Sequence, residues 1–180
     1  MNTNHSVCLI TIDGTDFRMR EPTVFDRRWF SHKFKGPGLR YEIGVCIQTG
    51  WIVWINGPYA PGDWSDLAIA RYGVATKLGP GEKYLADRGY NSQDGNAETP
   101  SGHNNHDQRM KAGARARHEA INALLKQYGI LRDCFRHSRN DHALVFKAVV
   151  NLVQAKIMLE GATYQVAYND RMMALIVIHI

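Results

Sequence analysis

Apolar and polar positions along the chain follow two different periods. Short apolar, β-branched runs bounded by turn residues predict buried strands at residues 6–12, 41–48, 51–59 and 83–87. Apolar residues at helical spacing predict helices at residues 66–78, 110–128 and 140–159. Thr49-Gly50 predicts a tight hairpin turn between the second and third strands, and Ser65 is placed to cap the first helix. The first strand is expected to end at Asp13-Gly14-Thr15-Asp16.

The order of these elements indicates the fold class. A strand, a hairpin and a helix come first, and a later strand follows this helical crossover. That order predicts an α/β fold, in which helices flank a mixed sheet of antiparallel hairpin strands plus a parallel strand. We expect one domain over residues 1–160, with residues 161–180 adding a strand or a tail. The polar stretch 91–108 predicts a long surface loop.

Composition excludes several classes of protein. A length of 180 residues suits one domain with a real core. The N-terminus has no signal-peptide pattern, and the apolar stretch 172–178 is too short to span a bilayer, so we expect an intracellular protein without a membrane partner. Cys8, Cys46 and Cys134 are widely spaced, which predicts reduced thiols and no zinc site or disulfide framework.

The positive charge is concentrated in one part of the chain. The net charge is +5, and residues 101–140 hold eight Lys and Arg against three Asp and Glu. A local basic field favours a polyanionic partner such as nucleic acid. A solvated basic helix face explains the charge equally well.

Two carboxylates lie at the ends of predicted core strands. Asp13 follows CLITI and Asp87 follows KYLA. Sites in open α/β sheets gather at the carboxyl ends of strands, so these two side chains could meet in one crevice. Two neighbouring carboxylates repel unless a hard cation such as Mg²⁺ neutralises them. Each aspartate taken alone is explained as well by a turn or a helix cap.

A single glutamate interrupts the basic run RARHEAIN at residues 115–122. On a helix, Arg115, Glu119, Asn122 and Lys126 share one face. If this face meets the strand ends, Glu119 completes a cluster of three carboxylates and the bases contact phosphates. A surface salt bridge is the alternative role for Glu119.

Several segments in the same order resemble one family. They are LITIDGTDFRMREP (9–22), APGDWSDL (60–67), KYLADRGY (83–90), RARHEAINALLKQYGILRDCFRH (115–137) and FKAVVNLVQAKI (146–157). Together they resemble the DDE endonuclease domain of PIF/Harbinger-type transposases. The resemblance implies a ribonuclease H-like fold. It also implies the catalytic, metal-binding acids Asp13, Asp87 and Glu119, with Asp66 as a secondary metal ligand.

The chemistry implied by this resemblance is metal-dependent cleavage or strand transfer of DNA. Two Mg²⁺ or Mn²⁺ ions would serve an in-line displacement at phosphorus, with Asp13 bridging both ions. Asp87 would bind one ion and Glu119 the other. The residues expected to contact DNA are Arg88, Arg115, Arg117, Asn122 and Lys126.

The chain departs from the family pattern in one respect, because no helix-turn-helix region precedes its first strand. We therefore expect a separate DNA-binding partner, with homo-oligomer formation open and a nuclear location. One alternative is a catalytically silent, domesticated module that binds DNA or protein. The other is an unrelated α/β protein, which would hold Asp13, Asp87 and Glu119 far apart.

Overall fold

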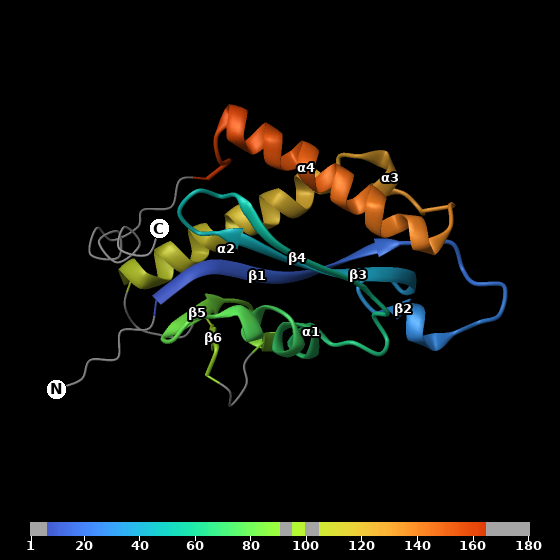
Figure 1. The fold of residues 1–180 in the computed structure, drawn as a ribbon, viewed down its shortest axis with the longest axis horizontal. Coiled ribbons are helices and arrows are strands. Elements are labelled where there is room, and N and C mark those ends of the chain that lie inside the picture. The colour runs from blue at the N-terminus through green and yellow to red at the C-terminus, as the bar shows by residue number, and fades with distance from the viewer. Residues whose placement is uncertain (1–6, 91–94, 100–104, 165–180) are drawn as a thin grey trace.

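A mixed sheet organises the protein (Figure 1). The computed structural model describes residues 7–90, 95–99 and 105–164. Its strands are β1 (Val7–Arg18), β2 (Phe30–Ser31), β3 (Gly36–Cys46), β4 (Ile52–Tyr59), β5 (Glu82–Leu85) and β6 (Ala97–Glu98). The order is β2-β3-β1-β5-β6, and β4 also pairs with β3. β3 is antiparallel to β1, β2 and β4, whereas β5 is parallel to both β1 and β6.

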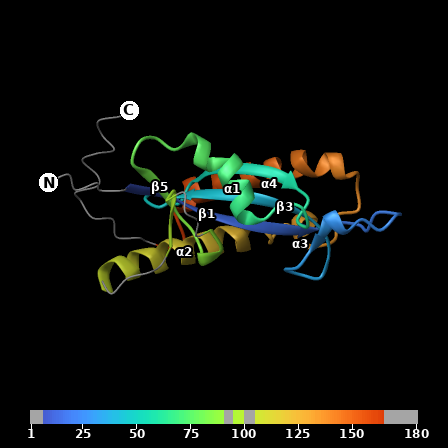
Figure 2. The same ribbon diagram turned by 90° about the horizontal axis from the view of Figure 1, so that it is seen from below.

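Helices cover both faces of this sheet. They are α1 (Asp66–Tyr72), α2 (Asn105–Leu125), α3 (Gly129–Arg132) and α4 (His142–Glu160). Short 3-10 turns are η1 (Arg27–Trp29), η2 (Val74–Lys77), η3 (Arg88–Tyr90) and η4 (Arg139–Asp141). α2 and α4 share one core with β1 and β3, and α1 lies on the opposite face, as Figure 2 shows. The predicted α/β class, a mixed sheet flanked by helices, is confirmed.

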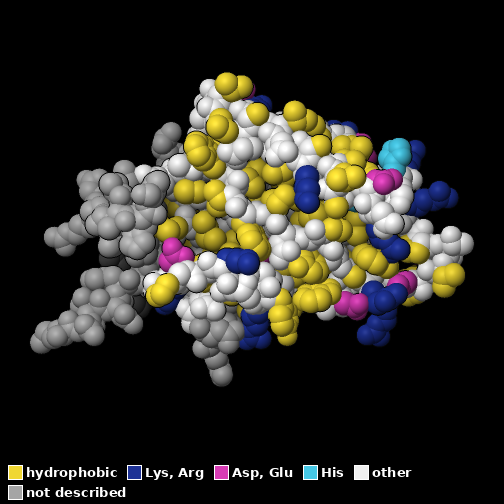
Figure 3. All heavy atoms as spheres, viewed as in Figure 1, with side chains coloured by type: hydrophobic (Ala, Val, Ile, Leu, Met, Phe, Trp, Pro, Cys, Tyr) yellow, Lys and Arg dark blue, Asp and Glu magenta, His cyan; other side chains and the backbone are white. Residues whose placement is uncertain are grey.

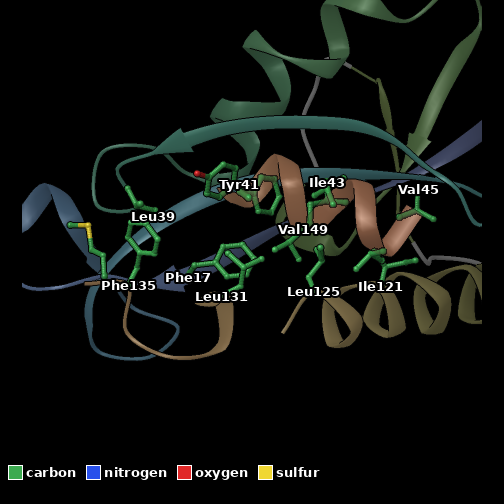
Figure 4. Close-up of a cluster of buried hydrophobic side chains, with 14 of the residues drawn as sticks. Phe17, Leu39, Tyr41, Ile43, Val45, Ile121, Leu125, Leu131, Phe135 and Val149 are labelled. Carbon is green, nitrogen blue, oxygen red and sulfur yellow. The ribbon is translucent and has the colours of Figure 1, made fainter. Parts of the chain in front are cut away.

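The alternation of side chains along β1 divides its residues between these two faces. Phe17 packs into the large core with Leu125 of α2 and Val149 of α4 (Figure 4). Ile12 belongs to the smaller core on the α1 side. Because successive side chains of a strand point to opposite faces, Asp13 lies on the same side as Phe17. β1 therefore presents Asp13 towards α2.

The strand β1 is longer than the sequence predicts. Its turn-like segment 13–16 continues the strand, because each residue pairs with β3: Asp13 with Ile43 and Asp16 with Arg40. The expected strand end at Asp13 is therefore wrong, and Asp13 lies within the sheet.

The predicted helices largely agree with the structure. Ser65 caps α1 as expected, accepting a hydrogen bond from the backbone N–H of Ala68 at 3.2 Å. α1 ends at Gly73, earlier than predicted, and the chain continues as a 3-10 turn. β2 and β6 are short strands that the sequence did not predict, and β6 interrupts the expected loop 91–108. The strand or tail predicted for 161–180 lies, from residue 165 on, outside the described residues.

The last helix is apolar on both its inner and its outer surface. A window of 18 residues within Arg139–Glu160 has a mean hydropathy of 1.4, so length and composition alone would allow this segment to cross a membrane. In the fold, α4 packs on the sheet through Phe146, Val153 and Ile157, while Leu144 and Leu159 stay exposed. The buried side chains explain the apolar inner surface of this helix, and they do not account for its exposed leucines.

Candidate active site

Two adjoining pockets lie between β1 and α2, and both are lined by Asp13 and Glu119. The large pocket has a volume of about 450 Å³. Its walls are Asp13, Gly14, Thr15, Asp16, Arg18, Lys33, Phe34, Glu119, Asn122, Lys126, Leu131 and Arg132. The small pocket, about 50 Å³, is lined by Thr11, Ile12, Asp13, Leu85, Ala86, Asp87, Arg115, His118 and Glu119. All three predicted acids therefore surround this pair of pockets.

Asp13 is the most firmly held of the three acids. Its backbone lies in the paired part of β1, and its Oδ2 accepts a hydrogen bond from Asn122 Nδ2 at 3.2 Å. Burial raises the pKa of Asp13 above its usual value, and the charges of Asp66 and Glu119 raise it further, against the opposing effect of Lys33. A desolvated carboxylate among like charges gains most from a nearby cation.

Asp87 and Glu119 are held more loosely. Asp87 follows β5, its side chain is 61% exposed, and its Oδ1 accepts from the backbone N–H of Arg88 at 2.6 Å. Arg115 Nη2 lies 3.8 Å from the same Asp87 oxygen. Glu119 is exposed one helical turn after Arg115. Both carboxylates are thus free to turn within the mouths of the pockets.

The donor chemistry of this site suits a hard divalent cation. Mg²⁺ takes oxygen ligands and keeps several waters, so it needs few carboxylates. Among the described residues, however, no three His, Cys, Asp or Glu side chains lie close enough together to hold one ion. Binding a common ion would require the exposed side chains of Asp87 and Glu119 to turn towards Asp13.

Asp66 lies on the opposite face of β1 from the pockets and lines neither of them. Its carboxylate lies over Gly14, where an added Cβ would be 2.1 Å from Asp66 Oδ1. Arg40 Nε is 3.4 Å from Oδ1 and Lys33 Nζ is 3.8 Å from Oδ2. Asp66 therefore acts on Asp13 through charge across the strand, and its placement does not support a ligand shared with Asp13.

Two of the residues predicted to contact DNA have structural roles instead. Arg117 is only 2% exposed, because it lies on a different side of α2 from Arg115 and Glu119. It donates to the backbone carbonyls of Ile47, Gln48 and Tyr164. The prediction for Arg117 is therefore wrong.

Asn122, which is 8% exposed, holds the Asp13 carboxylate and offers little surface to a phosphate. The other predicted contacts remain accessible. Arg88, Arg115 and Lys126 are exposed, and Lys126 lines the large pocket.

A buried histidine closes the small pocket against β1. Thr11 Oγ1 lies 3.3 Å from the carbonyl oxygen of Val45, to which it donates, and 2.8 Å from His118 Nδ1. When the hydroxyl donates its single proton to Val45, His118 Nδ1–H donates to the hydroxyl and Nε2 carries no proton. Burial lowers the pKa of His118 to about 4, so the ring is neutral at pH 7 and fixes α2 on β1.

Sequence reasoning missed a polar network beside the pockets. Asp16 is 5% exposed and forms two hydrogen bonds with Arg40, at 2.7 and 2.9 Å. Burial raises the pKa of Asp16, but the hydrogen bonds from Arg40 and Ser31 outweigh burial and hold that pKa below its usual value. Lys33 donates to the carbonyl of Gly14 and so places a cation in the wall of the large pocket. The sequence does carry a signal for Asp16 and Arg40, because each is a charged residue within an otherwise apolar strand. It carries no such signal for Lys33, which lies in a basic loop.

Comparison with known proteins identifies one family. The model of one family, described as DDE superfamily endonuclease, matches residues 12–154, which extend from β1 into α4 and include Asp13, Asp87 and Glu119. No match was found among curated proteins or among solved structures. The mixed sheet with helices on both faces is consistent with the ribonuclease H-like fold of such enzymes. The chain belongs to the DDE superfamily endonuclease family.

Proposed function

We propose that this protein is a divalent-metal-dependent DNA endonuclease of the PIF/Harbinger transposase type that acts in the nucleus. The observation that supports this most directly is the position of Asp13. It is fixed by β1 and Asn122 where two pockets meet, with Asp87 and Glu119 at their walls. Acids that attract metal and bases that attract phosphate thus line the same space.

Each residue of the site has a separate role in the proposed reaction. Asp13 provides the fixed ligand, and Asp87 and Glu119 complete the ligand set by turning towards it. Two bound Mg²⁺ or Mn²⁺ ions would activate the attacking water or 3′-hydroxyl and stabilise the leaving oxygen. Asn122 keeps the Asp13 carboxylate in one orientation. Arg115 and Lys126, one at each pocket, hold the DNA backbone.

Nicking of supercoiled plasmid by purified protein tests this proposal. We expect nicking with Mn²⁺ or Mg²⁺ and none with EDTA. Loss of an outer-shell partner costs metalloenzymes roughly 10–100-fold, so Asp87→Asn and Glu119→Gln should each lower the rate by roughly 100-fold or more. Asp63→Asn, which neutralises an exposed carboxylate away from both pockets, is the matched control and should nick normally. Nicking that survives both site substitutions would refute the assignment.

A catalytically silent DNA-binding module is the second candidate. It is favoured by the separation of the acids, since no three metal-binding side chains among the described residues converge on one point. Such a module would bind DNA with the same affinity in EDTA and in Mn²⁺ and would never nick it. Mn²⁺ binding measured by calorimetry separates the two candidates, because only the nuclease should lose it on Asp13→Asn.

A further inference from the structure

A basic surface at the end of β1 is not used by the candidate active site. It surrounds a third pocket of about 300 Å³, here called the β1-end pocket. The pocket is lined by Met19, Arg20, Glu21, Pro22, Thr23, Phe135, His137 and Arg139. Figure 3 shows Lys and Arg side chains gathered at this end of the molecule, on the right of the view.

Backbone hydrogen bonds join two distant segments to build this pocket. Phe135 N–H donates to the carbonyl of Arg18, and Arg20 N–H donates to the carbonyl of Phe135, both at 2.9 Å. Met19 and Phe135 are 5% and 2% exposed, so they anchor the two segments in the core. Because side chains alternate along an extended chain, Arg18 and Arg20 project away from that core on either side of Met19.

The two arginines of this pocket differ from their neighbours in how they are paired. Nearby Arg28 and Arg132 are paired with Asp26 and Asp133, at 2.7 and 3.0 Å. Within the described part of the chain, no carboxylate pairs with Arg20 or Arg139.

One of these two guanidinium groups is held in place. The Arg139 guanidinium lies over the Trp29 ring, 4.2 Å from its centroid. Stacking orients the group and leaves its N–H edges available to an acceptor. Glu21 is the one acid in the lining, and it is exposed to water.

The β1-end pocket continues from the large pocket along the same two segments. Arg18 and Arg132 line the large pocket, and Arg20 and Phe135 line the next one. Two residues of extended chain span roughly 7 Å. A DNA strand carries one phosphate per nucleotide, so a strand held in the large pocket can continue over the β1-end pocket.

We propose that the β1-end pocket binds the DNA backbone on one side of the cleavage point. Arg20 and Arg139 contact phosphates beyond those held in the large pocket. This inference rests on the proposed function, because it takes DNA as the substrate. It adds that the protein holds DNA asymmetrically, with its main flanking contact beyond the end of β1.

The test measures DNA binding without cleavage. Fluorescence anisotropy of a labelled duplex in EDTA gives Kd over a series of salt concentrations for the wild type and the double variant Arg20→Ala/Arg139→Ala. Each lost phosphate contact lowers the slope of log Kd against log salt by roughly 0.9, so the double variant should lose roughly 1.8. Its Kd at low salt should rise at least about 10-fold.

The control variant Lys77→Ala/Lys147→Ala removes the same two charges from exposed positions outside the three pockets. It should leave the slope unchanged. A slope for the arginine variant equal to that of the control would overturn the proposal. Thermal unfolding checks that both variants fold. If the double arginine variant does not fold, the test is repeated with Arg20→Glu, a single substitution at an exposed position.

The two proposals fail in different ways. Protein that never nicks plasmid, yet shows the loss of slope in EDTA, would refute the nuclease and support the β1-end contact. Protein that nicks, with unchanged slope and KM in the arginine variant, would support the nuclease and refute the contact. A wild type that binds no DNA would refute both.

Discussion

Glu42 places an ionisable carboxyl inside the fold. It belongs to β3 and is 1% exposed. Its Oε1 accepts a hydrogen bond from Trp54 Nε1 at 2.7 Å, whereas Oε2 has no hydrogen-bond partner among the described residues. Burial, reinforced by the charge of Asp66, raises the pKa of Glu42 to about 7. We predict that this single group contributes a stability that is lost as the pH rises.

The sign of this pH dependence follows from whether the folded or the unfolded chain binds the Glu42 proton more tightly. With a pKa of about 7 when folded and an ordinary value of 4.5, Glu42 keeps its proton in the folded chain after the unfolded chain has lost it. The contribution of Glu42 to the free energy of unfolding is therefore highest below about pH 4.5 and falls until about pH 7. At about 1.4 kcal/mol per pH unit, the fall amounts to roughly 3 kcal/mol.

Glu42→Gln isolates this contribution. Glutamine keeps the acceptor for Trp54 and removes the titration, so the difference in free energy of unfolding between variant and wild type should grow by roughly 3 kcal/mol from pH 4.5 to pH 7.5. Urea unfolding followed by tryptophan fluorescence measures it at intervals of half a pH unit. Other titrating groups are common to both proteins and cancel. Parallel curves for the two proteins would refute the reasoning.

Two further predictions concern residues around the site. Gly14→Ala would place a Cβ 2.1 Å from Asp66 Oδ1, so we expect a loss of roughly 1–3 kcal/mol in urea unfolding, as for other overpacked sites. Gly129→Ala, whose added Cβ has its nearest neighbour at 3.5 Å, is the control, and equal losses in both would contradict the clash. Arg117→Met should cost at least roughly 1–3 kcal/mol because it removes the guanidinium that donates to the buried carbonyl of Ile47, while the Kd of the folded variant for DNA stays unchanged. Weaker DNA binding at unchanged stability would restore Arg117 as a DNA contact.

Local sequence pattern is sufficient for elements whose signals lie within a few residues. Apolar spacing predicts α4, and Ser65 predicts the start of α1. The same kind of pattern misplaces the end of β1, because Asp13-Gly14-Thr15-Asp16 has the composition of a turn. The strand continues because β3 pairs with it, and Arg40, 24 residues away, balances Asp16. No local window contains that partner.

The candidate site shows the same difference between local sequence signals and contacts between distant segments. Helical spacing predicts that Arg115, Glu119 and Lys126 share a face, and they line the two pockets. Basic charge alone assigns Arg117 to DNA, although helical geometry turns it away from that face. Glu42 of β3 and Lys33 of the turn before β3 are both near Asp66 of α1 in the folded chain, so their effects on Asp66 depend on contacts between distant segments.

The exposure of Asp87 and Glu119 affects which substitutions accumulate in a gene for this protein once selection for its activity ends. Neither side chain is buried, so replacing either should change the free energy of unfolding little. Loss of Asp16 or Arg40 would instead leave a buried charge unpaired, which costs roughly 3–5 kcal/mol. On the proposed assignment, one substitution at position 87 or 119 would therefore end cleavage and leave a folded protein that purifying selection on stability cannot remove. In gene copies released from selection for cleavage, we expect inactivating changes to accumulate first at these two positions.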